Sequence, residues 1–122
     1  MATDRQPLVC VETLLSLQES LDGEKALCRN FVIRYVQMWP GRFERIQAAV
    51  ANGDDVDAMD SALSLRSSSL MVGATRLGKL TDDLIGLLEC RSHVAAGRKL
   101  ASLRACGNQT AGELTAFCAA GE

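Results

Sequence analysis

A chain of 122 residues and 13.1 kDa is long enough for one domain and too short for two of ordinary size. Nearly half of it (48%) is apolar but only 4% is aromatic, and this Leu- and Ala-rich composition with two prolines favours helix over sheet. The net charge of −2 and the pI near 5.4, with arginines spread along the chain, argue against nucleic-acid binding, which normally requires a basic face.

The number and spacing of the cysteines indicate the cellular compartment in which the protein works. They are scattered, no two form a Cys-x-x-Cys pair, and the chain starts without the pattern of a secretory signal. No apolar run is long enough to cross a bilayer. We therefore expect a cytoplasmic protein without membrane contact, whose reduced thiols pack as small apolar groups. The cysteines are Cys10, Cys28, Cys90, Cys106 and Cys118.

The first half of the chain predicts two helices. Residues 1–11 read as a loose lead-in, followed by a single domain over residues 12–120. A leucine stripe predicts a short helix over 12–21, and Asp22 is a candidate N-cap for the next helix. Apolar residues at helical spacing continue from Cys28 to Val50, with a kink or short break expected around Pro40 at Met38–Gly41.

The second half predicts three more helices. Asp54 can cap a helix that runs to about Val72, where Gly73 breaks it. A fourth helix should start near Ala74 and fade around 95–97, and glycines weaken the last one. Because short connections make neighbouring helices antiparallel, we expect an all-α protein, an up-down four-helix bundle with an additional short N-terminal helix.

The segment 60–77 is the most informative because its helix has two apolar faces. Small residues and Leu65 form one face, which we assign to the core. Leu63 lies about 200° from Leu65 around a helix with roughly 100° per residue, so it should point outward. An exposed apolar strip of this kind usually marks a partner surface. The alternative is that the short N-terminal helix covers Leu63. The core face is Ala58, Ala62, Leu65, Ser69 and Val72; the strip is Met59, Leu63 and Leu70, edged by Asp60, Arg66 and Ser67.

The order of small residues in this segment resembles a known family. Ala-Leu-Ser-Leu-Arg-Ser-Ser-Ser over 62–69, followed by Val72-Gly73-Ala74 and Leu77, resembles the signature of the histidine-containing phosphotransfer (HPt) domain, approximately A-H-[ST]-L-K-G-[SA]-[SA]-x-x-[LIV]-G-A-x-x-L. The resemblance extends over about residues 12–119. It implies the same helical bundle, a role in two-component phosphorelay signalling, and a response-regulator receiver domain or a hybrid histidine kinase as partner.

The chain departs from that family where the chemistry occurs. Leu63 occupies the position of the phosphoacceptor histidine, and an aliphatic side chain has no nucleophilic nitrogen. Arg66 matches the family's basic residue and could meet the acidic pocket of a receiver, whereas Ser67 replaces a glycine. The resemblance therefore implies a degenerate member that docks a receiver without carrying phosphate, rather than an enzyme, with the six residues of the strip and its edges as the partner-binding surface.

No other residue is a good substitute phosphoacceptor. His93, the single histidine, lies thirty residues downstream, late in the fourth helix or in the turn after it. The hydroxyls of Ser64, Ser67, Ser68 and Ser69 have no neighbouring base in sequence. Clustered metal ligands, a haem attachment motif and phosphate-binding loops are absent from the sequence, so we expect no cofactor and no metal.

Two alternatives remain open at this level. One is a helical adaptor or a homodimerising module that uses the same strip for a partner unrelated to receivers, so that the chain would be a monomer or a weak homodimer. The other is a diverged remnant of the family with a purely structural role.

Overall fold

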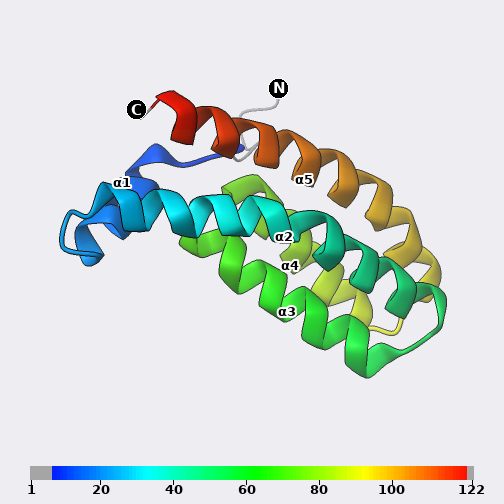
Figure 1. The fold of residues 1–122 in the computed structure, drawn as a ribbon. Coiled ribbons are helices and arrows are strands. Elements are labelled where there is room, and N and C mark those ends of the chain that lie inside the picture. Colours follow the sequence, from blue (N-terminus) through cyan, green and yellow to red (C-terminus); the bar gives the residue numbers. More distant parts are fainter. Residues whose placement is uncertain (1–6, 121–122) are drawn as a thin grey trace.

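The computed structural model describes residues 7–120, and within them it is all-helical, without strands (Figure 1). The five helices pack against one another. α3 packs on α2 and α4, α5 packs on the same two helices, and α1 packs on α2 and α3. The predicted helical class is thus confirmed. The helices are α1 (Val11–Ser20), α2 (Lys25–Ala51), α3 (Asp55–Met71), α4 (Thr75–Glu89) and α5 (His93–Ala120).

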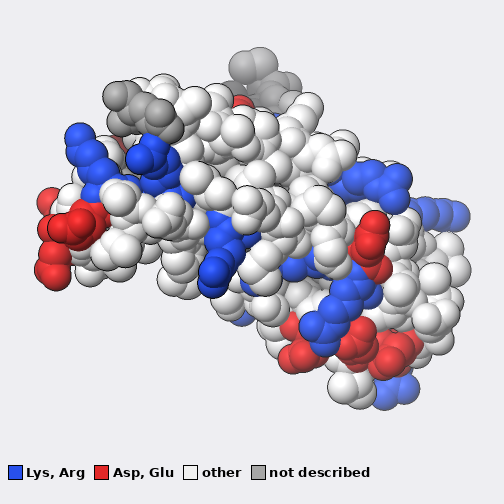
Figure 2. Space-filling view, in the orientation of Figure 1, with Lys and Arg blue, Asp and Glu red and all other residues white. Residues whose placement is uncertain are grey.

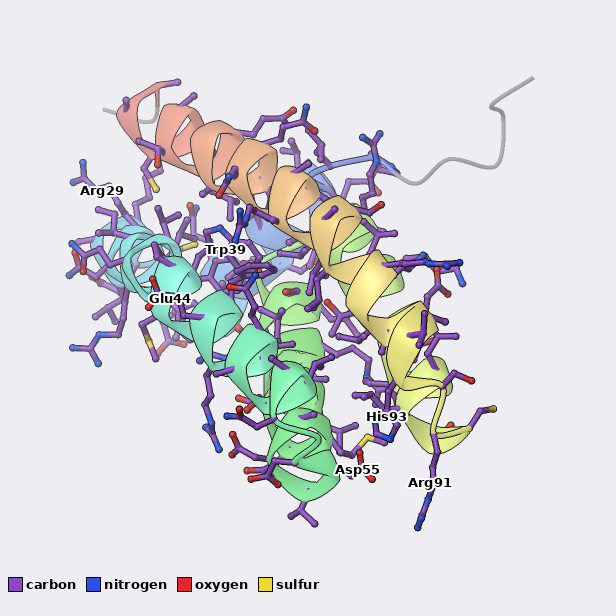
Figure 3. The ribbon with its side chains drawn as sticks, turned by 90° about the vertical axis from the view of Figure 1, so that its right-hand side faces the viewer. Arg29, Trp39, Glu44, Asp55, Arg91 and His93 are labelled. Carbon is purple, nitrogen blue, oxygen red and sulfur yellow. The ribbon has the colours of Figure 1, made fainter. Side chains whose placement is uncertain are left out.

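Every helix contributes leucine or isoleucine to one core, as the spacing of apolar residues predicts. Between α2 and α5, Trp39 lies directly against Gly107, and the indole Nε1 donates a hydrogen bond to Asn108 Oδ1 at 2.9 Å (Figure 3). The largest fully buried apolar side chains are Leu14, Val32, Ile46, Leu65, Val72, Leu77, Leu84, Leu103 and Leu114.

Of the kink or short break expected around Pro40, the break does not occur, because α2 continues through it as one helix of 27 residues. Proline removes one backbone donor. Trp39 and Phe43 on either side of the proline are both buried in the same apolar stripe. Burial of that continuous stripe holds the helix together across the missing hydrogen bond.

The predicted cap at Asp22 is also wrong. Asp22 adopts a left-handed backbone with φ of 59°, and Glu24 precedes the first turn of α2 without a side-chain capping bond. At the next turn the prediction is confirmed, since the Asp54 carboxylate accepts a hydrogen bond from the backbone N–H of Asp57 at 3.1 Å. Gly73, with φ of 76°, ends α3 as expected.

The turn between α4 and α5 comes earlier than predicted. α4 ends at Glu89 rather than fading near 95–97, and Arg91 makes the turn in a left-handed conformation with φ of 56°. Glycine normally marks such a position, and Arg91 carries no such signal. His93 consequently begins α5 and does not lie in α4.

The cysteines follow the predicted pattern only in part. All five are free, and Cys28, Cys106 and Cys118 are buried, while Cys10 is half-buried and Cys90 is exposed. Burial raises the pKa of the Cys28 and Cys106 thiols, which favours their protonated forms over the thiolates.

The predicted lead-in lies partly outside the described residues. Within residues 7–10, the backbone N–H of Cys10 donates to the Gly73 carbonyl at 2.7 Å, and the Pro7 carbonyl accepts from Arg76 N at 3.1 Å. These residues thus bond to the turn between α3 and α4. Over the described part of the chain, no helix combines the length and the apolar character of a membrane span.

Candidate docking surface on the third helix

The two faces of α3 lie as the sequence predicts. Each residue of the predicted core face is at most 1% exposed, whereas Leu63 on the opposite side is 39% exposed. α3 buries its core face against α2 and α4, which leaves the side of Leu63 outside. The core-face residues are Ala58, Ala62, Leu65, Ser69 and Val72.

The apolar strip is longer than predicted. Met59 is half-buried and Leu70 is 52% exposed. Val56, two helical turns before Leu63, is 82% exposed and lines the same shallow hollow as Leu63 and Met59. The seven-residue steps from Val56 to Leu63 and Leu70 could have revealed it, but Val56 stands among the aspartates that mark the helix start.

α1 does not cover Leu63. The residue before α1 bonds beyond the C-terminal end of α3, where the Cys10 N–H donates to the Gly73 carbonyl, and Leu14 of α1 enters the core. The hollow around Leu63 is lined by α3 residues alone. This excludes the alternative in which the strip is buried under the N-terminal helix.

The edge of the strip toward α4 is formed by an ion pair. Arg66 Nη1 donates to Asp82 Oδ1 at 2.9 Å, and both side chains remain more than a third exposed. Leu70 packs beside Gly78 of α4, and together with Arg66 and Asp82 these residues line a second hollow. Arg66 thus reaches the surface with its charge held toward α4.

The edge toward α2 is acidic. Arg45 Nη2 lies 2.6 Å from Asp57 Oδ1 and 3.5 Å from Asp60 Oδ2. The hydrogen bond from Arg45 lowers the pKa of the Asp57 carboxyl, which therefore stays ionised. Figure 2 shows acidic side chains gathered over this N-terminal end of α3, beside basic side chains of α2.

Three of the four candidate hydroxyls make hydrogen bonds within the bundle. Ser69 is buried and its Oγ lies 2.5 Å from Tyr35 Oη, so it serves the core. Ser68 Oγ donates to the backbone carbonyl of Ser64, and the Ser64 hydroxyl accepts from Arg42 at 3.2 Å. Ser67 is exposed beside the strip.

His93, the first residue of α5, lies beside the N-terminal end of α3 and therefore far from Leu63. Its Nε2 is 3.6 Å from Asp55 Oδ1, at the first residue of α3 (Figure 3). At a rise of roughly 1.5 Å per residue, Asp55 is about 12 Å from Leu63 along the axis. Within residues 7–120, no three His, Cys, Asp or Glu side chains gather as metal ligands would.

Comparisons of the whole chain with protein-family models, with curated proteins and with solved structures find no match.

Proposed function

We propose that this chain is an HPt-like domain that docks a receiver domain without accepting phosphate. Its fold would be an up-down four-helix bundle of α2 to α5, with α1 packed against it, working in the cytoplasm. Short turns between successive helices, and the packing of α2 and α4 each against both α3 and α5, support that architecture.

The observation that carries the proposal is the outward position of Leu63. The residue at the place of the family's histidine is exposed, so a partner can reach it, but it is aliphatic and cannot form phosphohistidine. An exposed apolar strip bordered by charges suits docking without group transfer.

Arg66 supplies a charge that can change partners. It stands about one helical turn from Leu63, and its pair with Asp82 is exposed on both sides. Exposed ion pairs contribute about 0–1 kcal/mol, so turning Arg66 toward carboxylates of a receiver costs little. The acidic pocket around a receiver's phosphorylatable aspartate is a matching target.

The mechanism is occupancy. Met59, Leu63 and Leu70 would cover an apolar patch of the receiver while Arg66 approaches its acidic pocket. A receiver held in this way is withheld from phosphotransfer proteins that do carry a histidine.

The first experiment is binding by calorimetry with purified receiver domains. Arg66→Glu should weaken binding at least tenfold, and Arg98→Glu, the same charge change at an exposed position of α5, should leave it unchanged. Both variants should keep the unfolding temperature within a few degrees. Equal effects of the two variants would contradict a specific role of Arg66.

The second experiment is phosphotransfer. Incubation with a phosphorylated receiver or an active kinase should leave no label on the protein. Acid-labile label on His93, or acid-stable label on any serine, would overturn the proposal.

A second candidate is an adaptor unrelated to receivers, or self-association through the same strip. The exposure of Val56 and Met71, 82% and 50%, favours it, because they carry apolar surface beyond the strip that the HPt resemblance implies. Self-association that Leu63→Asp abolishes, without any binding to receivers, would decide for this candidate.

A further inference from the structure

α2 carries a second apolar stripe on its outer surface. Leu27, Phe31 and Met38 are 52%, 37% and 44% exposed. Glu24, the residue directly before α2, and Arg34 complete a series in which steps of three and four residues alternate, the spacing of a coiled-coil seam. Figure 2 shows acidic side chains where α1 and α2 meet, and separated basic side chains over the first half of α2.

The two charged residues of this seam are exposed and can therefore pair with groups of another molecule. Glu24 is exposed and makes no capping hydrogen bond at the start of α2. Arg34, further along α2, is exposed as well. Neither residue has an ionic partner among the described residues. Between Glu24 and Arg34 the seam therefore has an acidic end, an apolar centre of Leu27 and Phe31, and a basic end, and Met38 lies beyond this part.

Such a seam complements itself when it is reversed. Glu24 stands three residues before Leu27, and Arg34 stands three residues after Phe31. An antiparallel alignment that sets Leu27 against Phe31 of a second copy therefore also sets Glu24 against Arg34 of that copy. A twofold axis repeats each pair. A parallel alignment would oppose like charges.

We propose that the chain forms an antiparallel homodimer through this seam of α2. Two Leu27–Phe31 contacts form its centre, and two Glu24–Arg34 ion pairs flank them and set the register. None of the residues paired in this interface belongs to α3, so the proposal does not rest on the partner that α3 docks.

The test is the dissociation constant of the full chain by sedimentation equilibrium. The dissociation constant of the wild-type dimer should lie below roughly 1 mM. Glu24→Arg and Arg34→Glu should each weaken the dimer about tenfold, because each replaces two attractive pairs by two repulsive ones. The double variant should recover the wild-type constant, since the swapped charges pair again.

Two control variants show whether the dimer forms through α2 rather than through another surface. Arg98→Glu, an equal charge change on α5, and Leu63→Asp, on the strip of α3, should both leave the dimer intact. Circular dichroism should show the same helix content in every variant. A protein that stays monomeric up to roughly millimolar concentration, a double variant that fails to recover, or a dimer that Leu63→Asp abolishes would overturn the proposal.

Discussion

Gly107→Ala should destabilise the protein although alanine is the better helix former. Gly107 lies inside α5 with its backbone against the indole of Trp39. A Cβ built there would overlap the ring carbons Cζ2, Cη2 and Cε2. The indole has no room to retreat, because Trp39 is only 4% exposed and its Nε1 is bonded to Asn108.

The magnitude follows from three contributions. Alanine gains about 1 kcal/mol over glycine in a helix interior. Overpacking of a dense core costs about 1–3 kcal/mol, and displacing the indole also forfeits its hydrogen bond to Asn108, worth about 1 kcal/mol. The overlap here involves a rigid ring rather than a flexible side chain, which puts the cost at the upper end. We expect the free energy of unfolding to fall by about 2–3 kcal/mol.

Gly112→Ala provides the matched control on the same helix. Nothing lies within 4 Å of a Cβ at Gly112, so this variant should gain up to about 1 kcal/mol. Urea unfolding followed by circular dichroism measures both changes. A Gly107→Ala variant as stable as the wild type would refute the argument, as would two variants that shift stability in the same direction.

Three further predictions test other parts of the structure. Burial raises the pKa of Tyr35 to about 12, so the folded protein keeps this proton while the unfolded chain loses it near 10; the free energy of unfolding should therefore fall by ~2–3 kcal/mol between pH 10 and 12, and a Tyr35→Phe variant should lack this component in alkaline urea titrations. Asp54→Ala should cost about 1 kcal/mol because Asp57 N–H loses its capping acceptor, whereas Asp54→Asn, which retains an oxygen acceptor, should cost much less in the same assay. Leu65→Ala should cost about 2–5 kcal/mol and Leu63→Ala about 0.5 kcal/mol or less, and comparable losses would contradict the orientation of α3.

Local signals in the sequence predicted most helix boundaries and the two faces of α3. Asp54 and Gly73 mark the ends of α3 because a carboxylate can cap free amides and because glycine adopts a positive φ without strain. Helical geometry alone places Leu63 and Leu65 on opposite faces. Because Leu65 is buried, Leu63 must then point outward. Val56 was missed because its aspartate neighbours suggested a solvated helix start.

Other features depend on contacts between distant residues. Arg91 adopts a left-handed turn without a glycine signal, and Pro40 stays inside α2 because Trp39 and Phe43 on both sides of it are buried. Arg66 of α3 forms an ion pair with Asp82 of the neighbouring helix α4, and no local pattern in the sequence predicts this pair.

The strip of α3 illustrates the same division. Spacing by itself determined that Leu63 and Leu65 lie on opposite faces of a helix, because a side chain's direction depends on its own backbone. Only the tertiary structure decided that the Leu63 face remains open, since α1 could have covered it and instead bonds at the Gly73 end of α3. Whether a face is buried depends on where other helices pack, and that is set by the core as a whole.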